Sequence, residues 1–336
     1  MNKILVTGAA GLIGSALVEQ LKKQNYEVVC CDIRLKDNPL SFFSEEVIPL
    51  LKECIGVIHL AAISRVIHGE QYPELCKKVN VEGTTKFLEL CKLLPNKPWI
   101  IYASSREVYG EQKNLPVIEE SASLDPVNNY ARGKVLIEEL VTNLESFDFN
   151  VAVLRFSNVY GGLLDHYNRV VPAFCINALK GDPIRVEGKE CVFDFTYLED
   201  VVEGISLTVN HLQNIKSSLS PIHFTACKPC NLEELANIVL EITESNSKIN
   251  FYPARNFDVS RFYGDFSKAK ELLGWSPKHS LEEGLSKFIK SLKNSRPTCP
   301  GNIDMVIYEN IEKLFMATRP IIVPVLKYIV RSLLMN

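Results

Sequence analysis

Short apolar runs alternate with longer amphipathic segments along the first half of the chain. The apolar runs predict buried strands, and they lie at residues 4–6, 27–31, 56–60, 99–103 and 151–156. Apolar residues recur at helical spacing in segments between them, at 15–23, 72–94 and 130–143. Strands that alternate with helices are typical of a parallel sheet covered on both faces. The pattern therefore predicts an α/β fold with a doubly wound parallel sheet.

After about Leu163 the pattern changes to shorter apolar runs that prolines interrupt. Helix starts remain visible there, because Asn231 and Ser280 each precede a Glu by three residues, the spacing of a capping box. We expect residues 1–162, joined by some later segments, to form the domain of the parallel sheet. Residues 163–295 would form a smaller C-terminal α/β substrate domain, and residues 296–336 an extension. A cleft between the two domains would hold ligands, because parallel sheets bind them beyond the carboxyl ends of their strands.

A glycine-rich turn follows the first predicted strand. Glycines stand at Gly8, Gly11 and Gly14, where a Cβ would block the pyrophosphate of a dinucleotide. The second predicted strand ends on Asp32, and an acid there accepts hydrogen bonds from the ribose hydroxyls and repels a 2′-phosphate. Together these features predict a Rossmann-type site that binds NAD rather than NADP. Arg34, two positions later, weakly favours NADP instead.

Candidate catalytic residues follow the strand predicted at 99–103. Ser105 stands at its carboxyl end, and Tyr130 and Lys134 come later, four positions apart on one helix face. We expect the ammonium of Lys134 and a positively charged nicotinamide to lower the pKa of Tyr130 from its usual ~10. The phenolate would then accept a proton from a substrate hydroxyl while hydride leaves the same carbon for NAD. Ser105 would hydrogen-bond the oxygen that becomes a carbonyl.

Composition narrows the class of protein. With 336 residues, of which 46% are hydrophobic, the chain can bury a sizeable core. A formal net charge of -3 provides no general attraction for nucleic acid. Several of the ten cysteines lie in apolar patterns, and no signal peptide precedes the first strand, so we expect a cytoplasmic protein with reduced thiols. Cys227 and Cys230 form a single CxxC in a loop, and we expect no metal site.

Six motifs within residues 1–290 fit one family. They are Thr7–Gly14, His59–Ala62, Asn80–Thr84, Ser104–Gly110, the Tyr130-x-x-x-Lys134 pair and Arg155–Gly161. Together they resemble the extended short-chain dehydrogenase/reductase family, the NAD-dependent nucleotide-sugar epimerases and dehydratases. The resemblance implies that Ser105, Tyr130 and Lys134 are the catalytic set, with Lys134 also contacting the nicotinamide ribose. It implies that further residues bind NAD: Gly8, Gly11, Leu12, Ile13, Gly14, Asp32, Leu60, Ala61, Ala62 and Asn80.

The resemblance also implies that the smaller domain binds the nucleotide-sugar. Asn158 would contact this substrate, Arg255 matches an arginine that clamps the substrate pyrophosphate, and Phe262 falls where relatives place a gate residue beside the sugar.

Two departures from the family pattern stand out. Relatives often have another diphosphate-binding arginine where this chain has Phe193, and Arg169 and Arg261 are the candidates to replace it. The short interval from Asp32 to His59 indicates that the usual third strand is shortened or absent. Relatives carry an acid beside the adenine on that strand, and Glu45 and Glu46 are candidates for its role here.

The residues after Ser105 limit the reaction. Arg106-Glu107 stand where the 4,6-dehydratases that this chain resembles have Asp-Glu as acid and base, and a guanidinium never gives up its proton, so dehydration is disfavoured. Glu107 and Asn168-Arg169 also resemble residues of UDP-glucuronate decarboxylase. Phe193, in place of the usual arginine, weakens this interpretation. A 4-epimerase needs only the catalytic set, tightly held NAD and room for a 4-keto sugar to turn over.

The sequence therefore predicts an NAD-dependent 4-epimerase that acts through a transient 4-keto intermediate on a UDP-hexose or UDP-hexuronate. The alternatives are a UDP-glucuronate decarboxylase, a 4-keto-sugar reductase, and an NAD-binding scaffold that has lost catalysis. We expect a homodimer, because the helices near 80–94 and 130–144 have apolar residues on more than one face. The apolar segment 321–335 is too short and charged for a membrane span. Packing on the protein's own surface or across an oligomer contact is favoured over an interfacial membrane helix.

Overall fold

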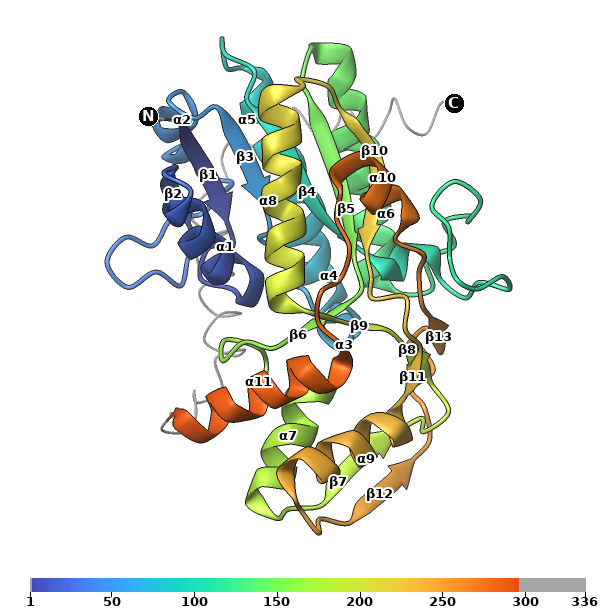
Figure 1. Ribbon diagram of the computed structural model, residues 1–336. Coiled ribbons are helices and arrows are strands. Elements are labelled where there is room, and N and C mark those ends of the chain that lie inside the picture. Colours follow the sequence, from blue (N-terminus) through green and yellow to red (C-terminus); the bar gives the residue numbers. More distant parts are fainter. Residues whose placement is uncertain (1, 296–336) are drawn as a thin grey trace. The chain divides into compact units, whose positions relative to one another are not determined.

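The computed structural model describes residues 2–295 and is built around a parallel sheet of six strands (Figure 1). The strand order is β10-β5-β4-β3-β1-β2, and every neighbouring pair is parallel. The strands are β1 (Lys3–Thr7), β2 (Glu27–Cys31), β3 (Gly56–His59), β4 (Trp99–Ser105), β5 (Val151–Phe156) and β10 (Leu219–Phe224). The predicted Rossmann-type α/β fold is confirmed.

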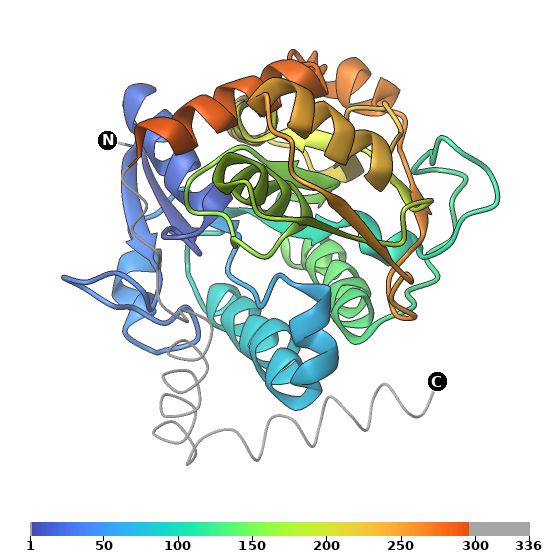
Figure 2. The same cartoon turned by 90° about the horizontal axis from the view of Figure 1, so that it is seen from below.

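Helices cover both faces of this sheet (Figures 1 and 2). On one face, α1 (Leu12–Lys23) and α8 (Leu198–Asn214) pack with the strands into a hydrophobic cluster that includes Leu17, Ile101 and Ile205. The other face carries α5 (Thr84–Lys92) and α6 (Asn129–Thr142). The helix before α5 is made of α4 (Pro73–Lys77) and a π-helical turn at Lys78–Gly83. These layers hold the carboxyl ends of the strands at one edge, where ligands bind in such sheets.

The chain passes from β2 to β3 through a loop and the short helix α2 (Val47–Leu51), with no strand between them. Within the described residues β2 is therefore the edge strand, as the short interval between Asp32 and His59 indicates. Leu40, Phe42 and Phe43 from the loop are buried, and the Phe42 ring packs edge-on against His59 at 4.8 Å between centroids. Apolar side chains thus attach this loop to the protein.

Smaller sheets make up the rest of the described chain. They pair β6 (Asn158–Tyr160) with β9 (Phe195–Tyr197), β7 (Ile184–Glu187) with β12 (Ile249–Tyr252), and β8 (Val192–Phe193) with both β11 (Cys230–Asn231) and β13 (Arg261–Phe262). Helices α7 (Val170–Lys180), α9 (Leu232–Thr243) and α11 (Leu281–Asn294) contribute to a second cluster around Phe174, Val186, Leu235 and Phe288. The capping boxes predicted at Asn231 and Ser280 are present.

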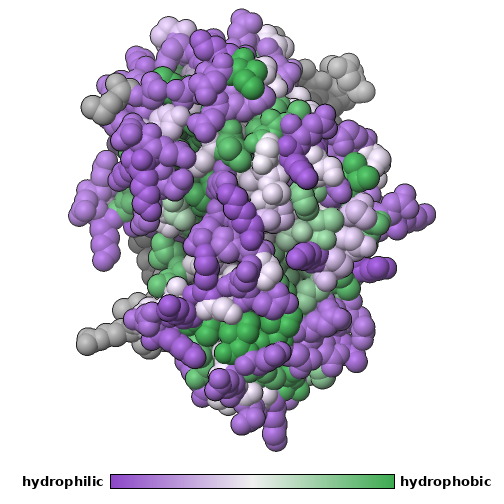
Figure 3. Space-filling model, viewed as in Figure 1, coloured by the Kyte–Doolittle hydropathy of each residue, from purple (hydrophilic) through white to green (hydrophobic). Residues whose placement is uncertain are grey.

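Later segments return to the large sheet. Both α8 and β10 belong to its layers, and α10 (Ser267–Leu273) packs against them. The division at residue 162 remains a proposal about domains. Hydrophobic residues gather in the lower third of the space-filling view, over the region of the smaller sheets, on an otherwise mostly hydrophilic face (Figure 3).

No helix within residues 2–295 combines the length and the apolar composition that a bilayer crossing needs. The expectations for the extension at 296–336, including the segment 321–335, lie outside the described residues.

Candidate active site

The glycine-rich turn brings the start of α1 close to the end of β3. Gly8 has a φ of +71°, and a Cβ there would lie 2.8 Å from the backbone nitrogen of Ala61. A Cβ on Gly14 would collide with the carbonyl oxygen of Gly8. Gly11 is the N-cap of α1, and no side chain within the described residues caps this helix. The first N–H groups of α1 thus form a cradle that fits the pyrophosphate of NAD.

Asp32 lies at the end of β2, where its buried carboxylate meets both the turn and Arg34. One oxygen accepts a hydrogen bond from the backbone of Ala10 at 3.0 Å, and both oxygens accept from the guanidinium of Arg34, at 2.8 and 3.0 Å. Burial raises the pKa of Asp32, but the hydrogen bonds and charge of Arg34 outweigh burial and leave the pKa below its ordinary value. Asp32 is therefore a charged acceptor beside the cradle, as an NAD ribose requires.

Replacing Asp32 by Ala should change the choice of cofactor. The substitution removes the carboxylate that repels a 2′-phosphate and releases Arg34, a planar donor suited to phosphate. We expect the ratio of the Kd for NADP to that for NAD to fall by about tenfold or more, the equivalent of one ionic contact. Titration calorimetry with both cofactors measures this ratio. The Asp32→Ala/Arg34→Ala double variant is the control, since it should bind both weakly; an unchanged ratio in the single variant would contradict the role of Asp32.

The loop after β3 is fixed by polar contacts from two elements. Thr7 accepts a hydrogen bond from the backbone of Ala61 at 3.1 Å. The amide of Asn80 accepts from the backbone nitrogen of Ile63 at 2.8 Å and donates to its carbonyl oxygen at 2.9 Å. Asn80 therefore holds the Leu60–Ala62 loop in place, so its predicted role at the cofactor would act through that loop.

Ser105, Tyr130 and Lys134 lie together at the carboxyl end of β4. Asn128 begins α6 by accepting a hydrogen bond from the backbone of Ala131 at 2.9 Å, which places Tyr130 in the first turn. Tyr130 is hydrogen-bonded to Ser105. The Nζ of Lys134 lies 5.7 Å from the centre of the Tyr130 ring and donates to the Ala103 carbonyl oxygen at 2.6 Å. The structure therefore brings the three predicted residues together.

The expected lowering of the Tyr130 pKa is wrong for the protein itself. Burial raises the pKa of Tyr130 well above its ordinary value, and the hydrogen bond with Ser105 offsets this only in part. Burial also lowers the pKa of Lys134 to about 8, so its positive charge is itself disfavoured. Desolvation is the largest cause of both shifts, and the ammonium is directed at the Ala103 carbonyl oxygen.

Glu138, one turn beyond Lys134, anchors α6 to the sheet through a buried network. Its carboxylate accepts from Ser104 and from the guanidinium of Arg155, at 2.6 Å for Nη2. Arg155 also donates to the hydroxyl of Tyr109 at 3.0 Å. No motif in the sequence indicates this network, and its one signal is that Glu138 follows Lys134 at helical spacing on the same face.

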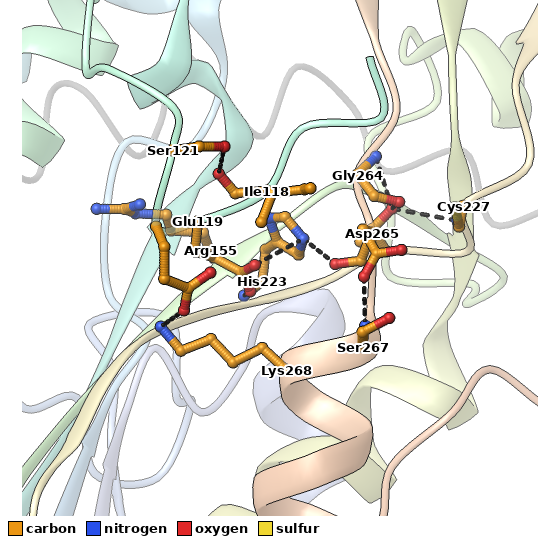
Figure 4. A network of polar contacts seen from close by, with 12 residues as sticks. Ile118, Glu119, Ser121, Arg155, His223, Cys227, Gly264, Asp265, Ser267 and Lys268 are labelled. Carbon is orange, nitrogen blue, oxygen red and sulfur yellow. Dashed lines mark hydrogen bonds and ion pairs between the residues drawn. The ribbon is translucent and has the colours of Figure 1, made fainter. Parts of the chain in front are cut away.

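The network continues to His223 on β10 (Figure 4). Burial lowers the pKa of His223 to about 4, so the imidazole is neutral at pH 7. Its Nε2 contacts the carbonyl oxygen of Asp265 and must donate there. Nδ1 therefore accepts from the hydroxyl of Tyr109, 3.2 Å away, and the backbone nitrogen of His223 donates to Glu119 at 2.9 Å. These contacts link the sheet beneath α6 to the segment that follows Phe262.

Glu107 is held by neighbours on two sides. One oxygen pairs with Arg106 at 2.8 Å, and the other accepts from the side-chain amide of Asn128 at 3.0 Å. Its negative charge contributes to the raised pKa of Tyr130. Glu107 is therefore part of the site, but its carboxylate is already engaged.

The predicted substrate residues are in different environments. Asn158 donates to the Asp194 carbonyl oxygen at 3.2 Å. Arg255 is exposed and pairs with Asp258 at 2.5 Å, so a substrate pyrophosphate would have to replace that partner.

The other two arginines and the predicted gate residue also lie in different environments. Arg169 pairs with Asp165 at 3.1 Å, and Arg261 is exposed. Phe262 is 1% exposed and stacks on Tyr109 with 5.9 Å between centroids, so it is a packed core residue as well as the predicted gate.

Within residues 2–295 no group of three or more His, Cys, Asp or Glu side chains is arranged to hold a metal ion. Nine cysteines lie in that range, Cys227 and Cys230 among them, and all are free thiols.

The chain is similar in sequence and fold to sugar-nucleotide enzymes. The model of the NAD dependent epimerase/dehydratase family matches residues 4–220. UDP-glucuronic acid decarboxylase 4 of Arabidopsis thaliana is 30% identical over 311 residues, which cover 87% of this chain and 68% of that protein.

Two solved structures are similar over most of the chain. The UDP-glucose 4-epimerase of Thermotoga maritima, solved with UDP-glucose, superposes with a TM-score of 0.79 at 30% identity, covering 87% of this chain and 98% of that one. The UDP-glucuronic acid 4-epimerase of Bacillus cereus, solved with UDP-glucuronic acid and NAD, gives 0.78 at 26% identity, covering 87% and 99%.

Proposed function

The chain belongs to the NAD-dependent epimerase/dehydratase family, and within it we propose that it is a nucleotide-sugar 4-epimerase that acts through a transient 4-keto intermediate. Its cofactor is NAD. The observation that carries the proposal is the set of Ser105, hydrogen-bonded Tyr130 and Lys134 beside a Glu107 whose carboxylate is already engaged. Such a site has the groups for reversible oxidation at one carbon, and the acid that follows Ser105 and Arg106 is already paired, which disfavours dehydration.

The residues divide the proton chemistry between them. Tyr130 accepts the proton of the substrate 4-hydroxyl and returns it after the keto sugar has turned over. Ser105 donates a hydrogen bond to the same oxygen and holds it against the phenol. Lys134, one turn along α6, holds its ammonium on the Ala103 carbonyl oxygen beside the Tyr130 ring, and Asn128 fixes the first turn of α6 so that Tyr130 keeps its position. Bound NAD supplies the hydride acceptor and a positive charge that favours the phenolate.

We propose a UDP-hexose or UDP-hexuronate as the substrate. Supporting this, the Thermotoga maritima structure contains UDP-glucose and the Bacillus cereus structure contains UDP-glucuronic acid. A UDP-glucuronate decarboxylase is the second candidate, favoured by Glu107 and by the Arabidopsis thaliana relative. The phenylalanine at 193, where relatives have a cation, and the pairing of Glu107 with Arg106 count against it.

Incubating the purified protein with UDP-glucose, UDP-glucuronate and their N-acetylated counterparts tests the proposal, with products separated by chromatography. C4 epimers are the expected products. A UDP-pentose released with carbon dioxide would identify a decarboxylase instead. Tightly bound NAD without any product would identify a scaffold.

We expect a preference for sugars without a 2-acetamido group, because Phe262 falls where relatives place a gate residue. Phe262→Ala should relax the preference, with a change in relative kcat/KM of ~1–3 kcal/mol. Comparing kcat/KM for UDP-glucose and its N-acetylated counterpart in both proteins measures it. Because Phe262 is also packed against Tyr109, thermal unfolding of the variant is the control for simple loss of structure. Better turnover of the acetylated sugar by the unmodified enzyme would contradict the gate.

We propose a homodimer in a reducing, cytoplasmic compartment. Leu93 follows α5 and is 79% exposed, while Leu136 on α6 is 49% exposed, so both helices offer apolar side chains outside the fold. Two such helices from each of two copies would form a four-helix bundle. Light scattering at micromolar concentration should give the mass of two chains. A Leu136→Glu variant should shift that mass toward one chain, and a single-chain mass for the unmodified protein would contradict the dimer.

A further inference from the structure

The guanidinium of Arg106 lies on two aromatic rings. Its Cζ is 4.7 Å from the centre of the Phe193 ring and 5.6 Å from that of Phe262. These phenylalanines are register partners on the parallel strands β8 and β13, so their rings form one platform. Aromatic faces attract a cation and restrict it without neutralising it. Arg106 is therefore fixed in position next to Ser105.

One end of this guanidinium has no hydrogen-bond partner in the part of the chain that the structure describes. Nη2 pairs with Glu107, but Nη1 is buried and finds no acceptor among residues 2–295. Arg106 is 7% exposed, so water does not readily compensate for the missing partner. A buried N–H of a charged group that lacks an acceptor is costly, and such groups usually bond to something. This N–H of Arg106 therefore requires a hydrogen-bond acceptor from outside residues 2–295.

From this geometry we propose, on the basis of the proposed function, that Arg106 donates through Nη1 to an anionic oxygen of the bound nucleotide-sugar. Relatives often place a substrate-binding arginine at position 193, and here the ring of Phe193 supports an arginine that comes from the end of β4 instead.

The other candidates for this role have different surroundings. Arg169 pairs with Asp165 at 3.1 Å, and Arg261 on β13 is exposed. Arg106 instead combines burial, an aromatic platform and a free donor beside the catalytic serine. Two groups of the substrate offer the acceptor: an oxygen of the diphosphate, or the carboxylate of a hexuronate.

Calorimetric titration of the Arg106→Gln variant with UDP, UDP-glucose and UDP-glucuronate separates these sources. We expect affinity to fall by roughly 10- to 100-fold, the loss of one charge-assisted hydrogen bond. An equal loss for all three ligands assigns the contact to the diphosphate. A loss confined to UDP-glucuronate assigns it to the carboxylate. Unchanged affinity for all three would overturn the proposal. Arg132→Gln, which removes an exposed arginine of α6, should leave all three affinities unchanged.

A second substitution tests whether a cation at position 193 can replace Arg106. Adding Phe193→Arg to Arg106→Gln returns a cation from β8 and should recover most of the lost affinity. If Arg106→Gln fails to fold, as judged by thermal unfolding with NAD, Arg106→Lys replaces it. Lysine keeps the pair with Glu107 but has only one donor nitrogen, so a smaller loss of affinity is expected. No loss of affinity would overturn the proposal. An unmodified protein that binds neither UDP nor UDP-sugars would refute the proposed function, which these titrations distinguish from failure at Arg106.

Discussion

Replacing Tyr130 by Phe is expected to lower kcat by about 10²- to 10⁴-fold, the usual contribution of a positioned proton acceptor. The variant loses one hydroxyl and keeps the ring that packs beside Lys134. NAD should bind almost as well as before, because the glycine turn and Asp32 are remote from this hydroxyl in the sequence and in the sheet. Product formation from the nucleotide-sugar found to be the substrate, followed by chromatography, gives kcat, and calorimetry gives the Kd for NAD.

Ser105→Ala is the matched control for this result. It removes the hydrogen bond that orients the substrate oxygen but leaves the proton acceptor, so its loss of kcat should be smaller. More than about a tenth of normal activity in Tyr130→Phe would show that another group takes the proton.

Replacing Glu138 by Ala is expected to lower the free energy of unfolding by about 3–5 kcal/mol, because it leaves Arg155 buried without its carboxylate. The two side chains are 5% and 6% exposed, and the carboxylate also accepts from Ser104. Urea unfolding followed by circular dichroism measures the change. Activity should fall as well, since α6 carries Tyr130 on the face that Glu138 attaches to the sheet.

The double variant Glu138→Leu/Arg155→Met distinguishes the effect of the ion pair on stability from the effect of side-chain packing. Apolar residues of similar size remove both charges together, so the double variant should be much less destabilised than the sum of its single variants. Simple additivity would mean that the two charges do not depend on each other.

Features that depend on neighbours along the chain could be predicted from the sequence. The glycines after β1, the capping boxes at Asn231 and Ser280, and β5 at Val151–Phe156 are found where the pattern indicates them. Each is decided within a few residues, by backbone space, by a local hydrogen bond or by a continuous apolar run. The grouping of Tyr130 with Lys134 is of the same kind, because helical spacing fixes it.

Features that depend on burial or on distant pairing could not be predicted. Spacing shows that Tyr130 and Lys134 share a face, but it does not show that desolvation dominates both pKa values or that Ala103 accepts from the ammonium. The platform under Arg106 requires β8 to pair with β13, and each of these strands has only two residues. No periodicity exists over so short a length, so the contact emerges only in three dimensions.

The loop between β2 and α2, which follows Asp32, can vary in sequence without loss of the fold. Its buried anchors, Leu40, Phe42 and Phe43, are separate in sequence from its exposed residues at 36–39. Substitutions and insertions are tolerated best where side chains are exposed, while anchors resist them. Selection can therefore change the exposed residues 36–39 without disturbing the buried anchors of this loop or helix α6, so the region after Asp32 and the helix that carries Tyr130 can evolve independently.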